Sequence, residues 1–124
     1  MSPRSGEFMD QARDRVVAAR QALAAGHAEV AVSAAYYAML YAARAALSEQ
    51  DEHARTHSGT WHLFRERCVT TGAFDEGLHS LAHQAQEARE GGDYEAITPE
   101  PRKAEAIVSG AGEFVAAVER MLAQ

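Results

Sequence analysis

The sequence predicts an all-α fold, an antiparallel bundle of about five helices that forms one domain over residues 1–124. Three observations support this prediction. Apolar residues recur at intervals of three and four along most of the chain, as on the buried face of a helix. Alanine is abundant and only 3 prolines occur, which favours helix. The segments between the apolar stripes are short, so sequential helices are expected to lie antiparallel.

The first two helices follow a short polar start, residues 1–6, which we expect to be flexible. Gly26 is expected to end the first helix, and the polar stretch 48–53 to end the second. The apolar stripe of the first helix comprises Met9, Ala12, Val16, Ala19 and Leu23. The stripe of the second comprises Val32, Ala35, Tyr36, Met39, Ala43, Ala46 and Leu47.

The last three helices are bounded by capping residues and glycines. We expect Ser58 to cap the third helix and Gly72 to close it. Asp75 is expected to cap the fourth, which the pair Gly91–Gly92 would stop. The fifth is expected to have Thr98 as N-cap and Pro99 at its first position. The apolar stripes of these helices comprise Trp61, Phe64, Cys68 and Val69; Leu78, Leu81, Ala82 and Ala85; and Ala104, Ile107, Val108, Ala111, Phe114, Val115, Val118, Met121 and Leu122.

Charge and composition exclude several classes of protein. The net charge of −6 argues against broad neutralisation of nucleic-acid phosphates, so any RNA contact must come from a few clustered arginines. No basic amphipathic face, signal peptide or run of about 18 apolar residues stands out, so no membrane association is expected. Cys68 is the only cysteine, which excludes an intrachain disulfide and fits a reducing cytoplasm. We expect it to be an inert, partly buried thiol.

A second stripe on the second helix combines tyrosine with arginine. It comprises Ser33, Tyr37, Tyr41, Arg44 and Ser48 and lies beside the apolar face. Tyrosine and arginine are enriched at the centres of interfaces, so Tyr37, Tyr41 and Arg44 are candidate interface residues. The alternative is that the rings complete the core while Arg44 reaches solvent.

The segment before the third helix is a candidate anion site. Free amides at a helix start attract anions, and Arg55, His57 and Ser58 would add donors for a nucleotide or RNA phosphate. The favoured alternative is that Thr56 and Ser58 cap the helix while the basic side chains are solvated.

Metal and cofactor sites are not expected. His79, His83 and Glu87 share one helical face, but solvated side chains are the favoured interpretation over a metal site. No phosphate-cradling glycine loop, dinucleotide fingerprint or nucleophile elbow occurs.

The end of the fourth helix holds a further candidate cluster. We expect Arg89 in the last helical turn, with Gly91–Gly92 allowing the chain to fold back so that Asp93 or Tyr94 returns to the guanidinium. Such a cluster can hold a phosphate, and it is equally a structural lock in which Asp93 pairs with the arginine.

Three segments together resemble one branch of the HEPN superfamily. They are residues 33–44 around Tyr36–Tyr37, the segment Thr56-His57-Ser58-Gly59, and Ala88–Arg89 followed by Asp93–Tyr94. The resemblance implies a helical bundle that forms homodimers and partners a minimal nucleotidyltransferase in prokaryotic toxin–antitoxin pairs. It also implies kinship with metal-independent ribonucleases.

The ribonucleases of that superfamily carry an arginine followed, after a spacer of about four to six residues, by a histidine. Counted from Arg89, those positions hold Tyr94, Glu95 and Ala96, so the expected histidine is absent. We therefore expect a binding or regulatory partner of a nucleotidyltransferase, one that contacts nucleotide or RNA. The alternative is a metal-independent endoribonuclease toxin with a non-standard site formed by Arg89, Asp93 and Tyr94.

Overall fold

The computed structural model confirms the all-α prediction. It describes the backbone of residues 1–124 and all side chains except those of Asp93 and Tyr94. The helices are α1 (Pro3–Ala24), α2 (Ala28–Glu49), α3 (His57–Phe64), α4 (Glu76–Glu95) and α5 (Pro101–Leu122), and a short π-helix, η1 (Arg65–Val69), continues α3. Within the described backbone there is no strand.

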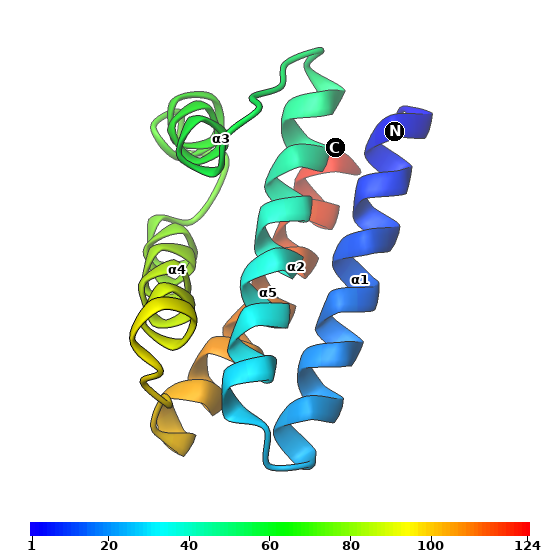
Figure 1. Ribbon diagram of the computed structural model, residues 1–124. Coiled ribbons are helices and arrows are strands. Elements are labelled where there is room, and N and C mark those ends of the chain that lie inside the picture. Colours follow the sequence, from blue (N-terminus) through cyan, green and yellow to red (C-terminus); the bar gives the residue numbers. More distant parts are fainter.

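Helix α2 is the centre of the bundle. Figure 1 shows α1 along one side of it, α3 and α4 along the other, and α5 behind it. Twelve of its residues are buried, and seven of them are alanines. Small side chains let neighbouring helices approach closely, and alanine favours helix most strongly. One alanine-rich helix can therefore contact all four others.

Several predicted helix boundaries are confirmed. Gly26 and Gly72, with φ of 83° and 85°, follow the ends of α1 and of η1, where the left-handed backbone suits glycine. Asp75 caps α4, because its Oδ2 accepts a hydrogen bond of 2.9 Å from the amide of Leu78. Helix α1 begins at Pro3, inside the stretch expected to be flexible, and Ser5 there is fully buried.

Three predicted boundaries are wrong. The hydroxyl of Thr56, not Ser58, caps α3 by accepting a hydrogen bond from the amide of Gly59. Helix α4 runs through Gly91–Gly92 and ends at Glu95, followed by the C-cap Ala96, whose φ is 55°.

The start of α5 is the third error. Its N-cap is Glu100 and its first residue is Pro101, rather than Thr98 and Pro99. The hydroxyl of Thr98 is used elsewhere, because it donates a hydrogen bond of 2.6 Å to Glu29 at the start of α2.

The apolar stripe of the third helix is interrupted by η1, which the sequence did not predict. There the amide of Thr70 bonds the carbonyl of Arg65, five residues earlier, instead of the carbonyl four residues earlier. The wider turn still buries Cys68 and Val69 against the core.

By length and composition alone, helix α2 could cross a membrane, although no such segment was expected from the sequence. Of its most apolar window, 67% is buried inside the bundle, as in the core helix of a globular domain.

Candidate functional site

The tyrosine–arginine stripe of α2 forms a face between α1 on one side and α3 and α4 on the other. We call this stripe, Ser33, Tyr37, Tyr41, Arg44 and Ser48, the α2 face. All five residues are partly buried, so they belong neither fully to the core nor fully to the exposed surface. Side chains from α1, α3 and α4 converge on it.

Arg89 of α4 contacts the tyrosines of α2. Its guanidinium carbon lies 5.1 Å from the centre of the Tyr36 ring and 5.5 Å from that of Tyr37, within the range of cation–π attraction. The sequence predicted Asp93 and Tyr94 as its neighbours, and those side chains lie outside the described residues. The predicted reversal at the glycine pair is wrong, since α4 continues past it and Arg89 is inside the helix, not in its last turn.

His57, the first residue of α3, approaches the same tyrosines from the other side. Its ring centre lies 5.8 Å from that of Tyr37, and its Nδ1 lies 3.1 Å from the hydroxyl oxygen of Tyr36. That oxygen also accepts a hydrogen bond of 3.1 Å from the indole Nε1–H of Trp61. We therefore assign the Tyr36 proton to the bond with Nδ1, which places the proton of the neutral His57 ring on Nε2.

Burial keeps both groups of this pair neutral, and nearby positive charge adds to this effect for His57 only. Desolvation, assisted by the positive charges of Arg44 and Arg89, lowers the pKa of His57 below 6.5, although Glu90 opposes this. Burial raises the pKa of Tyr36 above 10.0, although its hydrogen bond with Trp61 and the nearby arginines oppose the rise. His57 is thus a neutral hydrogen-bond donor between two cations at pH 7.

The three candidate sites predicted from the sequence therefore lie partly in one place. Arg89, His57 and the α2 face meet around Tyr36 and Tyr37. Ser58 is exposed on α3, and Arg55 is exposed in the segment before it. Tyr41, farther along the α2 face, also has a cationic neighbour, because Arg15 of α1 lies 5.5 Å from its ring centre.

The histidines of α4 lie away from this cluster. His83 pairs with Glu87 at 3.2 Å on the exposed surface. The ring of His79 stacks on Phe64 at 6.2 Å, and burial lowers the pKa of His79. Among the described residues, no group of three potential ligands is placed to hold a metal ion.

Sequence reasoning missed the roles of Tyr36 and Trp61. Tyr36 was placed in the core stripe, and it is fully buried there, but its hydroxyl organises the site. A signal was available, because a buried tyrosine hydroxyl needs a polar partner. Such a tyrosine in a core stripe predicts that a donor or acceptor from another helix approaches it.

The arrangement suits anion binding better than proton transfer. Arg44 and Arg89 supply permanent positive charge and planar donor groups, and His57 supplies a neutral N–H. A base that cleaves RNA must take a proton from the 2′-hydroxyl. Neither guanidinium can do so, and the free lone pair of His57 is held by the Tyr36 hydroxyl.

Comparisons with known proteins agree with this architecture. The model of the HEPN domain matches residues 5–121. A UPF0332 protein of Gloeobacter violaceus is 30% identical over 126 residues, which cover 100% of both chains. A protein of Methanocaldococcus jannaschii, named as a putative toxin, is 33% identical over 78 residues, which cover 63% of this chain and 52% of that relative.

Proposed function

We propose that this chain, which belongs to the HEPN domain family, is an RNA-binding component of a prokaryotic toxin–antitoxin-like or defence pair. Its α2 face and Arg89 bind single-stranded RNA without cleaving it. The observation that carries this proposal is the meeting of Arg89, His57 and Tyr37 from three helices. Single-stranded RNA is held by stacking on aromatic rings and guanidinium planes and by cations that contact phosphates.

The local charge supports RNA binding despite the net charge of −6. Arg15, Arg44 and Arg89 all lie on or beside the tyrosines of the α2 face. A few such contacts give binding that weakens with salt in proportion to the number of phosphates neutralised. A cytoplasmic setting, where RNA is present and the Cys68 thiol stays reduced, is part of the proposal.

RNA binding is tested by fluorescence anisotropy with a labelled single strand of about twelve nucleotides in chelator, at several salt concentrations. Arg89→Ala should weaken binding and reduce the slope of log affinity against log salt by about 1. Tyr37→Ala should weaken binding with little change of slope, because stacking is not a phosphate contact. Arg102→Ala, an exposed arginine at the start of α5, is the control with the same loss of charge.

Arg89→Lys separates charge from shape, because lysine keeps the charge and loses the planar fork. A wild-type protein that fails to bind RNA even at low salt would refute the proposal. If Arg89→Ala lowers the melting temperature and leaves RNA affinity unchanged, Arg89 is a structural lock instead.

A metal-independent ribonuclease is the second candidate, favoured by the proximity of His57 to two arginines. The same RNA is incubated in chelator and examined on a gel. Cleavage by the wild type that is lost in Arg89→Ala and in His57→Gln would establish this alternative. Intact RNA in the presence of binding would support the binding protein.

The partners implied by the family resemblance are also proposals. A second copy would use Tyr37, Tyr41 and Arg44, and light scattering at micromolar concentration tests it. A monomeric mass that is unchanged on replacing both tyrosines would refute the homodimer.

A minimal nucleotidyltransferase is the second proposed partner, and co-purification with the product of an adjacent gene tests it. The kinship with a relative named as a putative toxin supports a toxin–antitoxin setting.

A further inference from the structure

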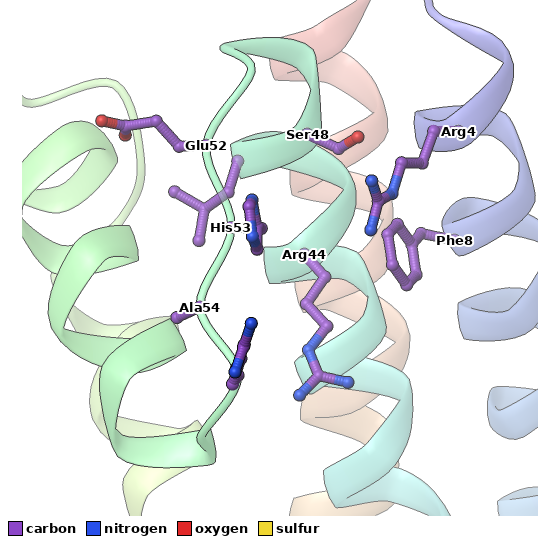
Figure 2. A pocket seen from close by; sticks show the side chains of 9 residues that line it. Arg4, Phe8, Arg44, Ser48, Glu52, His53 and Ala54 are labelled. Atoms are coloured by element: carbon purple, nitrogen blue, oxygen red, sulfur yellow. The ribbon is translucent and has the colours of Figure 1, made fainter.

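A cavity of about 320 Å³ opens at the end of the bundle where α1 begins and α2 ends. Figure 2 shows Arg4 and Phe8 reaching it from α1, Arg44 from α2, and His53 from the segment between α2 and α3. Arg55 of the same segment also lines it. The volume is within the range of small-molecule sites.

The cavity concentrates positive charge that the rest of the protein does not neutralise. Its three arginines, Arg4, Arg44 and Arg55, come from three different elements, and among the described residues none of them makes an ion pair. Elsewhere Arg13 and Arg65 do pair with glutamates. Within the part of the chain that the structure describes, the buried Nε of Arg44 also has no hydrogen-bond partner. Three guanidinium groups without an ion-pair partner around one cavity favour an anionic acceptor there.

The one acidic residue in the lining does not offset this charge. Both carboxylate oxygens of Glu52 accept hydrogen bonds from the guanidinium of Arg67, at 2.7 and 2.8 Å. In Figure 2 its carboxylate points away from Arg4 and Arg44. A bidentate pair of this geometry holds the carboxylate in place, so the cavity keeps its positive character.

We infer that this cavity binds a phosphate monoester, the group at the end of an RNA strand or on a free nucleotide. A monoester carries about −1.5 to −2 charges at pH 7 and three acceptor oxygens, which matches three guanidinium forks better than the single charge of an internal phosphodiester does. For RNA, the inference rests on the proposed function.

The cavity is continuous with the α2 face. Arg4 lies 5.9 Å from the centre of the Phe8 ring, and that ring stacks on Tyr41 at 6.3 Å with an interplanar angle of 21°. A strand whose terminal phosphate sits in the cavity would therefore pass Phe8 and reach Tyr41. The RNA end would be fixed at one end of the bundle and its next bases would lie along the α2 face.

The test compares strands of one sequence of about ten nucleotides that carry a 5′-phosphate, a 3′-phosphate or hydroxyls at both ends, together with adenosine monophosphate. Affinities are measured by isothermal titration with the full chain in chelator. We expect one phosphorylated strand to bind about tenfold more tightly than the hydroxyl strand, because the terminal phosphate adds charge and charge-assisted hydrogen bonds with the arginines. The tighter of the two phosphorylated strands identifies which RNA end is recognised.

Arg55→Ala should abolish this preference, because Arg55 is exposed in a connecting segment and its removal should leave the fold intact. Arg4→Ala should reduce it, whereas Arg102→Ala, at the opposite end of the bundle, should preserve it (Figure 1). Circular dichroism confirms that each variant is folded.

Each outcome separates the cavity from the α2 face. Equal affinity for phosphorylated and hydroxyl strands would overturn the cavity inference and leave RNA binding intact. Suppose that the protein binds adenosine monophosphate, that Arg55→Ala abolishes this binding, and that no RNA strand binds. This result would support the cavity inference and refute the proposed function. A preference for phosphate that survives both Arg4→Ala and Arg55→Ala would overturn the inference, because the phosphate would then bind elsewhere.

Discussion

The hydroxyl oxygen of Tyr36 lies 3.1 Å from Nδ1 of His57, although 21 residues separate them in the chain. The same oxygen accepts the indole N–H of Trp61. One hydroxyl on the central helix thus fixes two side chains of α3, and α3 is thereby held in register with the α2 face.

Removing that hydroxyl should loosen α3. Tyr36→Phe leaves Trp61 Nε1–H and His57 Nδ1 without their partner, so we expect the free energy of unfolding to fall by about 1–3 kcal/mol. Chemical denaturation measures this. Tyr37→Phe is the matched control, because the Tyr37 hydroxyl makes no hydrogen bond with the described residues, and its effect should stay within about 0.5 kcal/mol. Equal effects of the two substitutions would contradict the bridging role.

Stability should fall as the solution is acidified below pH 6.5. His57 has a lowered pKa, so between 6.5 and its folded value the unfolded chain takes up a proton that the folded chain does not. The stability present above pH 6.5 is therefore lost as the pH falls towards the folded pKa. His57→Gln should make the dependence on pH shallower in denaturation curves between about pH 7.5 and 5.

His79 contributes in the same direction, because its pKa is also lowered by burial. The dependence should therefore become shallower again when His79→Gln is added to His57→Gln. His27→Gln is the control, since this histidine is exposed in the turn before α2. An unchanged pH profile in the double variant would show that these histidines do not control acid stability.

Cys68 should resist thiol reagents in the folded protein. Its side chain is 1% exposed, and burial raises its pKa to about 11, so little thiolate forms at pH 8. We expect slow reaction with Ellman's reagent in buffer and complete, rapid reaction in guanidinium chloride. Fast labelling of the native protein would show that η1 opens readily.

Gly110 should be needed for the packing of α4 on α5. A Cβ at this position would lie 1.7 Å from Cδ2 and 3.1 Å from Cγ of Leu81, so Leu81 would have to move. Gly110→Ala should therefore lower the free energy of unfolding by about 1–2 kcal/mol, despite the better helix propensity of alanine. Gly6→Ala, where nothing lies within 4 Å, should instead stabilise α1 by about 0.5–1 kcal/mol.

The fold could be predicted because periodicity is a local property. The apolar stripes of α2 and α5 are continuous, and their residues are buried as expected, except that Met121 and Leu122 at the end of α5 are only partly buried. Boundaries failed where a tertiary contact outweighed a local signal. Thr98 is a good N-cap by type, but it bonds Glu29 instead, and Gly91–Gly92 tolerate helix when the surrounding turns continue.

The site was harder to predict because its members are far apart in sequence. Tyr37, His57 and Arg89 each gave a weak local signal, and nothing in their spacing showed that they meet. A motif of an arginine and a histidine a few residues apart does not reveal an arginine of α4 that faces a histidine of α3 across two tyrosines. Their meeting depends on how α3 and α4 pack on α2.

The central position of α2 also dictates an order of assembly during synthesis. Helices α1 and α2 leave the ribosome first, joined by a short turn at Gly26, and can form an antiparallel hairpin at once. The surface of α2 that α5 will cover stays open until the last helix has emerged, because α5 is made more than fifty residues later. A nascent chain therefore carries an uncovered apolar helix for much of its translation, and ribosomes that stall before α5 would release a product prone to aggregate or to be captured by chaperones.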